Sequence, residues 1–445
     1  MSTPYIPQAG ADRPRPGAGR PPRAALRLAL LAALSCASTL AFGQAANLTL
    51  DEALRLATGA SAASQAAQSA VQASTEAAAR AGQLPDPMLK LGIDNVPLSG
   101  PDQFSTTADF MTMRKLGIEQ QWVSADKRAA RQLRASRAVE AEQGAYLDTV
   151  ARVRAEAGKA WLTMLYAQRA LQLYRQLEQE TVADLRAVRA SHRGAQATAT
   201  DVLQSQLEQA QAGDDARRAE QELQAARIAL KRWTHVQADA VADAAPSLSA
   251  HAATKDDTAL EQRHPAAIAA QRASALADAD AALAVRERSP DWTFEAGFSQ
   301  RGSQYANMFS FGVSIPLTVN RGQRQDREVA EKAALATSAR LRHDDALLEL
   351  RAQRDTMASE RDSARQRIAQ LNADLLPAVR EQAALATAAY RSGAGPLSAV
   401  FKARRTLLEK QLQLNELEKQ AALIWARLEL DLIPHELAQA AGAAQ

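Results

Sequence analysis

The sequence has 445 residues, and 53 Lys and Arg against 50 Asp and Glu give a formal net charge of +3 and a pI near 9.0. Residues 1–43 hold five Arg and one Asp, so the remainder carries a net charge of −1 and no basic excess that would indicate nucleic-acid binding. Cys36 is the only cysteine, which excludes disulfides. Aromatic residues are 4% of the chain, a composition that favours long helices packed over small side chains.

The first 45 residues predict a secretory signal peptide. Arginines precede an uncharged run from Leu28 to Phe42, which is too short to span a bilayer as a helix. Small residues offer cleavage points at Ala41, Gly43 and Ala45. The alternative is a lipoprotein signal acylated at Cys36, although the leucine at position 34 is misplaced for that motif.

The first repeat is predicted over residues 46–240. A helix over 51–83 ends at a proline, and two short strands with alternating apolar and polar residues follow it. A helix without a convincing stop then runs from 124 to 192, which at 1.5 Å per residue measures about 100 Å. A turn reverses the chain, and a returning helix over 196–233 has a seam of apolar residues at heptad spacing, formed by Ala219, Leu223, Ala226, Leu230 and Trp233.

Residues 241–256 are predicted to be a linker or equatorial segment, and residues 257–433 repeat the design. Their expected elements are a helix over 257–288, two strands between 292 and 317, a long helix over 322–391 kinked at Pro377, and a returning helix over 397–432. The returning helix has a seam of heptad spacing formed by Leu407, Leu414, Leu417, Ala421, Ile424 and Leu428. Matching motifs lie 205 residues apart in the first strands, 195 in the second strands and 199 at the turns. A tail covers 434–445.

The predicted fold class is mainly α with a small β part: two hairpin repeats of long helices that form a helical barrel, and four strands per chain. Strands of about 9–12 residues with one apolar face match outer-membrane β-structure. Four strands leave two edges that lipid does not tolerate, so several copies must contribute, and a twelve-stranded trimeric barrel suits a conduit better than an eight-stranded one. Trp122 and Trp292 are expected at the membrane interface. The alternative is that these aromatics pack a small soluble sheet.

Several motifs resemble the TolC-type outer-membrane efflux proteins over essentially the whole mature chain. They are the segment from Asn47 to Ala57 and the segment His264-Pro265-Ala266-Ala267-Ile268. More narrowly, Pro85-Asp86-Pro87, Asp94-Asn95-Val96-Pro97, Asp109-Phe110-Met111-Thr112-Met113 and the segment from Ser314 to Glu328 resemble the heavy-metal-efflux branch of the CusC and CzcC type. One departure is Thr58-Gly59-Ala60, which stands where an asparagine-proline pair is usual.

The resemblance implies a homotrimer whose twelve-stranded barrel in outer-membrane lipid continues into a helical tunnel across the periplasm. It also implies a periplasmic adaptor (membrane fusion) protein and an inner-membrane pump of the RND type as partners. The turns are then the adaptor-docking tips, and each glycine there is expected to adopt a conformation that a side chain would resist. The tip residues are Arg193, Gly194, Ala195, Ser392, Gly393 and Ala394. Asp201 and Asp374 are candidates for a pore gate, because charges can set selectivity in a narrow pore.

The sequence carries no motif for catalysis or for a cofactor, such as a phosphate loop or a His-Glu-x-x-His helix. Met111 and Met113 are interpreted as membrane-facing or packed residues on one strand face rather than soft-metal ligands. Asp214-Asp215 and Asp256-Asp257 are interpreted as solvated charge. The histidines lack ligand spacing, and the one before Pro265 is interpreted as a helix start: they are His192, His235, His251, His264, His343 and His435. We expect no enzyme activity, no cofactor, no metal site and no nucleic-acid partner.

The predicted function is therefore the outer-membrane channel subunit of a tripartite efflux system, a passive duct for substrates that the motifs suggest are heavy-metal cations. One alternative is a duct for drugs or other small molecules. Another is a periplasmic coiled-coil adaptor or scaffold. Adaptors normally have one hairpin beside a lipoyl-like β domain, whereas here the unit of hairpin and strands occurs twice.

Overall fold

The computed structural model describes residues 47–244, 257–302 and 304–433. The predicted signal peptide, most of the predicted linker and the predicted tail lie outside the described residues, as do Cys36, His251, Asp256 and His435. The chain divides into two compact units, Met1–Ala46 and Asn47–Gln445, and all that follows concerns the second.

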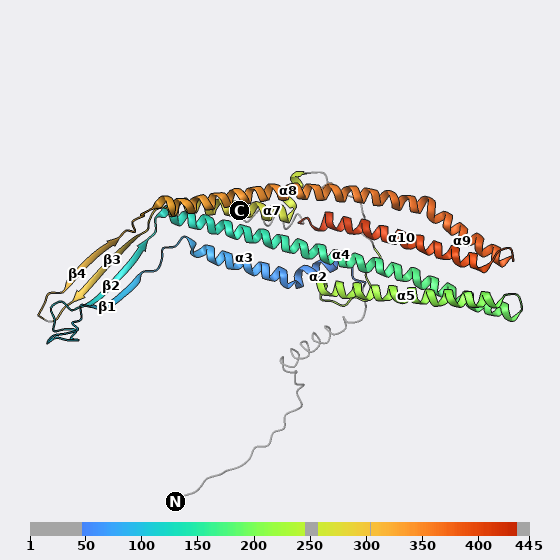
Figure 1. The fold of residues 1–445 in the computed structure, drawn as a ribbon, viewed down its shortest axis with the longest axis horizontal. Helices are drawn as coiled ribbons and strands as arrows, with labels where there is room; N and C mark the ends of the chain where they lie inside the picture. The colour runs from blue at the N-terminus through green and yellow to red at the C-terminus, as the bar shows by residue number, and fades with distance from the viewer. Residues whose placement is uncertain (1–46, 245–256, 303, 434–445) are drawn as a thin grey trace, which may run out of the picture. The chain divides into compact units, whose positions relative to one another are not determined.

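The two repeats have the same order of elements (Figure 1). The first consists of α2 (Leu50–Ala60), α3 (Ala62–Ala81), β1 (Met88–Asp94), β2 (Met113–Trp122), α4 (Ala125–Arg193) and α5 (Ala199–Thr234). The second consists of α6 (Asp257–Arg263), α7 (Pro265–Glu287), β3 (Trp292–Gln300), β4 (Met308–Ser314), η2 (Arg321–Gln323), α8 (Gln325–Gln370), η3 (Leu371–Leu375), α9 (Leu376–Arg391) and α10 (Leu397–Leu430).

Each repeat opens with two helices where one was predicted, and a side-chain cap explains each break. Ser61 has an extended backbone and accepts a hydrogen bond from the Ser64 backbone N–H at 3.2 Å, which starts α3. His264 accepts from the Ala266 N–H at 3.3 Å, and Pro265 occupies the first turn of α7. The prediction that His264 starts a helix is confirmed. In the first repeat the Ser61 cap starts α3, and no proline stands at that helix start.

The strands form one antiparallel sheet in the order β1-β2-β3-β4. Gly92 pairs with Lys115, and Gly297 pairs with Ser310, so the predicted repeat spacings of 205 and 195 hold in the strand register. The strands have 7, 10, 9 and 7 residues, which is shorter on average than predicted. Residues 315–317, expected to belong to the last strand, follow β4 as irregular chain.

The helices next to the sheet keep the lateral order of its strands. Helix α3 packs on α4, α4 on α7, and α7 on α8, and these four helices flank β1, β2, β3 and β4 in the chain. Farther from the sheet, α4 packs on α5 and α10, while α10 packs on α9 (Figure 1). The sheet therefore lies at one end of this unit, and the α4–α5 and α9–α10 turns lie at the other.

The main hydrophobic core lies around the middle of α4. Trp161 is fully buried, and its indole N–H donates to the Leu48 carbonyl at 2.8 Å. Leu48 also forms a parallel bridge with Val241, so the segment after α5 packs beside the start of the first repeat. A side chain at Gly158 would meet Leu430 at 2.3 Å, which explains how α4 and α10 approach so closely.

The long helices confirm one prediction and refine another. Helix α4 is continuous over 69 residues, or about 100 Å. In the second repeat the helix is interrupted by the π-helical segment η3, two residues before Pro377. Proline lacks an N–H, and its ring clashes with the carbonyl four residues earlier, Ala373, so a widened turn relieves the conflict. Among the described residues, no helix is both long and apolar enough to cross a bilayer.

The predicted seam of α5 is confirmed, and that of α10 is partly wrong. Ala219, Leu223, Ala226 and Leu230 are buried along α5, and Trp233 is half-buried against the main core. In α10, the predicted Leu417 and Ala421 are buried, but the other seam positions are only half-buried, and the buried face instead includes Leu408, Ala422, Ala426 and Leu430. The reason is that α10 packs against α4, α8 and α9 together, so a seam for a single partner does not describe it.

Candidate functional site

The sheet carries one apolar face and one polar face, as predicted. Two rows of facing residues across the strands form the apolar face: Leu89, Ile118, Ala296 and Phe311 in one, and Leu91, Leu116, Phe298 and Phe309 in the other. On the polar face Lys90 of β1 forms ion pairs with Glu119 of β2 and Glu295 of β3. Gly117, Gly297 and Gly312 also lie on this face, and no side chain projects from these three positions.

The apolar face has no cover among the described residues. Leu91 is 73% exposed and Phe311 is 81% exposed, although side chains of this kind are normally buried. Trp122 and Trp292 face each other at the helix end of β2 and β3, and both are about half exposed. The two tryptophans thus lie at the sheet–helix junction, and their place at a membrane interface stays a prediction.

At the opposite end of the unit, the α4–α5 and α9–α10 turns have the same backbone conformation, but their equivalent residues are not the ones that the sequence predicted. Ala195 has φ +57° and Gly393 has φ +74°, two residues after α4 and α9 end. The closing hydrogen bonds also match, because the N–H of Gln196 donates to Ser191 at 2.9 Å and that of Ala394 donates to Ala389 at 2.8 Å. The equivalent residues therefore lie 198 apart, and Gly194 corresponds to Ser392.

This register corrects the role predicted for Gly194. Its φ of −87° is open to any residue, and an added Cβ would meet nothing closer than the Ser191 carbonyl at 3.5 Å. The left-handed position of the first turn is occupied by Ala195, at a cost of about 1–2 kcal/mol relative to an ordinary conformation. The prediction holds for Gly393, which has both the left-handed conformation and open space around it.

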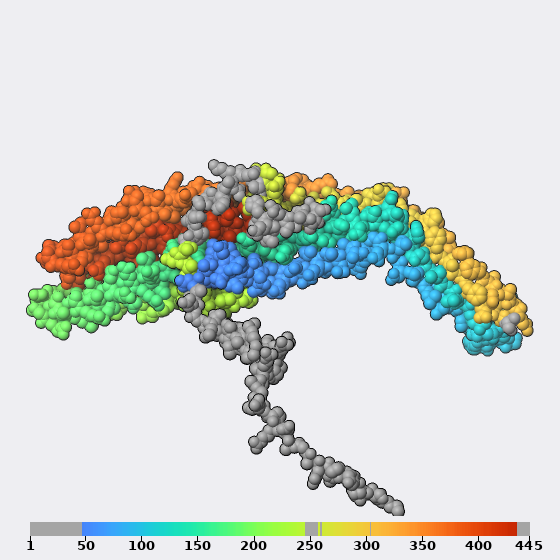
Figure 2. Space-filling view, turned by 180° about the vertical axis from the view of Figure 1, so that it is seen from behind, coloured from blue at the N-terminus to red at the C-terminus, as the bar shows by residue number. Residues whose placement is uncertain are grey.

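A small core joins the two turns, which lie side by side in Figure 2. Val188 of α4 packs with Leu397 and Phe401 of α10, and all three are buried. Arg404 of α10 forms ion pairs with Asp184 and Glu180 of α4. Burial, with Asp201 and Asp184 nearby, raises the pKa of the half-buried Tyr390. The two tips are therefore one packed structure.

The two predicted gate residues lie in different settings. Asp201 belongs to a capping box, in which its carboxylate accepts from the Thr198 N–H at 2.9 Å and from the Thr198 hydroxyl at 2.7 Å. These hydrogen bonds lower the pKa of Asp201. Asp374 is exposed within the π-helical segment. Local structure thus explains Asp201, and a role in a gate stays a prediction for both.

The other residues considered as metal ligands or as acid–base pairs do not form a site. Met113 begins β2, whereas Met111 precedes the strand, so the prediction that they share a strand face is wrong. The reason is the turn at Asp109, whose carboxylate accepts from the Met111 N–H at 2.6 Å, so that β2 begins only at Met113. Asp214 pairs with Arg218 at 3.0 Å, as befits surface charge. The described residues contain no group of three potential metal ligands.

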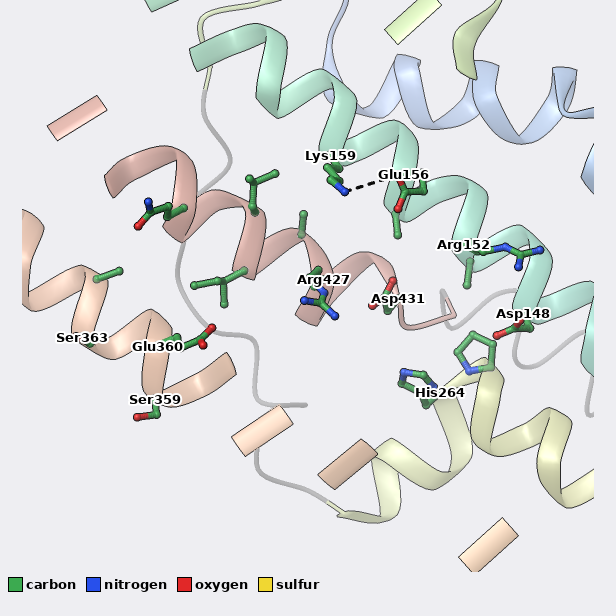
Figure 3. Close-up of a pocket in the computed structure, with 18 of the residues that line it drawn as sticks. Asp148, Arg152, Glu156, Lys159, His264, Ser359, Glu360, Ser363, Arg427 and Asp431 are labelled. Atoms are coloured by element: carbon green, nitrogen blue, oxygen red, sulfur yellow. Dashed lines mark ion pairs between the residues drawn. The ribbon is translucent and has the colours of Figure 1, made fainter. Parts of the chain in front are cut away.

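A polar cleft of about 1120 Å³ lies between α4, α8, the start of α7 and the end of α10 (Figure 3). Asp148, Glu156, His264 and Asp431 are among the residues that line it. Burial raises the pKa of Asp431 to about 6, and Glu156 and Asp148 act in the same direction against Arg427. Burial also lowers the pKa of His264. This cleft was not predicted, because it is built from four segments that are distant in the sequence.

Two further features of the tips were missed. The Thr198-x-x-Asp201 spacing is a capping-box pattern that sequence inspection can detect. The core of Val188, Leu397 and Phe401 has no such signal, because its members lie on different repeats.

Comparisons with known proteins agree with this architecture. The family model described as "outer membrane efflux protein" matches residues 257–431, the second repeat. No curated protein sequence matches significantly. Among solved structures, a membrane protein from Pseudomonas aeruginosa is 17% identical with a TM-score of 0.74, and the match covers 86% of this chain and 89% of that one.

Two further solved structures have nearly the same likeness. CusC, whose structures concern transmembrane channel formation, is 15% identical with a TM-score of 0.72 over 86% of this chain and 92% of its own. The outer membrane protein VceC from Vibrio cholerae is 17% identical with a TM-score of 0.71 over 86% and 95%. This chain therefore has the fold of the outer-membrane channels, and its second repeat has the sequence pattern of the outer membrane efflux protein family.

Proposed function

We propose that this chain is one of three identical subunits of an outer-membrane duct, through which an inner-membrane pump and a periplasmic adaptor export small solutes. The duct is passive and performs no chemistry. The observation that carries the proposal is the bare four-stranded sheet at the end of four long helices, in a fold shared with outer-membrane channels.

The physical argument rests on the sheet. Among the described residues, β1 and β4 have no partner on their outer edges. An exposed apolar face suits lipid, and lipid in turn requires every strand edge to be paired. Three copies, each pairing its β4 with the β1 of the next, close twelve strands without an open edge. The polar face with its glycines then lines a water-filled interior, and Trp122 and Trp292 lie at the inner interface.

The substrate that we propose is a heavy-metal cation. The support is the motif resemblance around Asn95 and Arg324 to the metal-efflux branch. The fold alone does not identify the substrate, because the solved structures named above are only 15–17% identical to this chain. A duct for drugs or other small molecules is the second candidate. The adaptor or scaffold alternative is disfavoured, because the helices and strands of the described residues match whole channel subunits.

The assembly is tested by cross-linking across the sheet edges. Replacement of Lys90 in β1 and Ser310 in β4 with cysteine places one thiol on each outer strand, and both lie on the polar face. A bifunctional thiol reagent should give covalent dimers and trimers of the doubly substituted protein in detergent. Each single variant is the matched control and should give no trimer. A water-soluble monomer that gives no cross-linked species would overturn the proposal.

The substrate is tested separately by deletion of the gene. We expect lower tolerance of cobalt, zinc, cadmium, copper or silver salts, restored by the intact gene. Unchanged metal tolerance together with greater sensitivity to organic antimicrobials would assign the duct to drug efflux. Unchanged tolerance of both classes would contradict an export role.

A further inference from the structure

Three arginines lie on one face of the last turns of α4. Arg186, Arg189 and Arg193 are spaced by three and four residues, which places them on the same side of a helix. All three are exposed, and within the described residues none forms an ion pair or a side-chain hydrogen bond. They form what we call the arginine face.

The carboxylates near the arginine face are already engaged. Asp184 pairs with Arg404, and Asp201 holds its capping box with Thr198. Residues 184–204 and 388–405 together contain seven Lys and Arg against two Asp and Glu. Arg404 and Arg405 also pair with Glu180, Glu208 and Asp215 outside these ranges. The positive charge at the tips that no ion pair in the described residues offsets is therefore that of the arginine face, Arg391 and Lys402.

Helix stabilisation does not account for the arginine face. A cation favours a helix C-terminus only within about the last turn. Arg193 is the final residue of α4 and meets that condition, but Arg186 and Arg189 lie seven and four residues before it. They are also not needed to bury apolar surface, because Leu185 and Val188 do so on another side of the helix.

The surface of α4 beside the arginine face is flat enough for a second helix to pack on it. Ala183, Ala187 and Ala190 are exposed on the side of α4 that points away from Leu185 and Val188. Small side chains allow a second helix to approach closely, and guanidinium groups beside them form charge-assisted hydrogen bonds with carboxylates. The complementary partner is a helix with exposed Asp or Glu.

We propose that the arginine face is an electrostatic docking surface for an acidic helical hairpin of the periplasmic adaptor. The inference rests on the proposed function and extends it by assigning the charge of the partner. Three exposed ion pairs, each of modest strength, give about a tenfold effect on the dissociation constant. Salt should weaken the contact.

The test uses two designed helical hairpin peptides that differ only in having Glu or Gln on their exposed face. Their binding to the detergent-purified full-length protein is measured by fluorescence anisotropy. The Glu peptide should bind, and the Gln peptide should bind about tenfold more weakly. Arg186→Gln, Arg189→Gln and Arg193→Gln together should remove this preference, while the same three changes to Lys should largely keep it.

The matched control is the triple change of Arg152, Arg342 and Arg365 to Gln, three exposed arginines far from the tips, which should leave binding unchanged. Equal binding of both peptides, or unchanged Glu-peptide binding by the Gln variant at the tips, would overturn the inference. A protein that still forms trimers and supports export under either result retains the proposed function. A protein that forms no trimer fails the proposed function itself.

Discussion

The two hairpin tips share one backbone but are stabilised by different means. The first turn places Ala195 in a left-handed conformation and compensates with the Thr198–Asp201 capping box. The second turn has Gly393 at that position, and α10 starts at Leu397 after Pro396, which provides no side-chain cap. The tips thus show that two repeats can keep the same turn conformation although different residues stabilise it.

The two repeats also differ along their long helices. Helix α4 runs unbroken to its tip, whereas the matching helix of the second repeat is interrupted at η3. The returning helices also end differently: α5 ends at Thr234 and is followed by His235 in a left-handed conformation, while α10 ends at Leu430 and is followed by the half-buried Asp431. Three substitutions can break or sharpen this comparison.

The largest effect is expected at Gly393. Gly393→Val forces a β-branched residue into φ +74°, which should destabilise the second tip by about 2 kcal/mol. Gly194→Val is the matched control and should change little, because its φ is −87°. Hydrogen exchange of the tip amides measures both. Equal acceleration by the two variants would show that the register of 198 residues is wrong.

The next effect is expected at Asp431. Its folded pKa of about 6 exceeds the ordinary 3.8, so the folded protein binds this proton more tightly than the unfolded chain. The charged form therefore costs stability above pH 6, and the cost disappears as the pH falls from 6 to about 4. Asp431→Asn should stabilise the protein at pH 7.5 by roughly 1 kcal/mol, less than the full shift implies because the carboxylate is partly exposed.

Thermal unfolding at pH 7.5 and pH 4.5 measures this change, and the gain from Asp431→Asn should fall to about a third at the lower pH, which is still above the ordinary pKa of 3.8. The control is Asp239→Asn, an exposed residue in the segment after α5, which should change the melting temperature little at either pH. A loss of stability at pH 7.5 would instead indicate that the charged Asp431 makes a favourable contact.

The smallest effect is expected at Ala195. Ala195→Gly removes the left-handed strain but increases the freedom of the unfolded chain, so the net gain should be about 0.5 kcal/mol. Slower hydrogen exchange around the first turn measures it. Ala394→Gly, at a position without positive φ, should give a slight loss instead. A loss at Ala195 as well would mean that the turn tolerates alanine without strain.

Much of the fold was predictable because its signals are local. The alternation of Leu89 and Leu91 with Lys90 gave the strand face correctly, and the absence of stops after Ser124 gave α4. The errors arose where tertiary packing or one hydrogen bond decides. Aligning the two glycines of the turns shifted the register by one residue, since the helix end sets the equivalence. The buried face of α10 depends on three neighbours, which a heptad pattern does not contain.

The open edges of β1 and β4 also constrain how such a protein is made. A lone copy exposes two rows of unpaired backbone groups beside residues such as Phe311, which makes it a template for aggregation. Under the proposed function, the barrel has to close while the sheets enter the membrane. Open strand edges are not tolerated in lipid, and the exposed apolar face is not tolerated in water. Biogenesis then depends on the encounter of three chains.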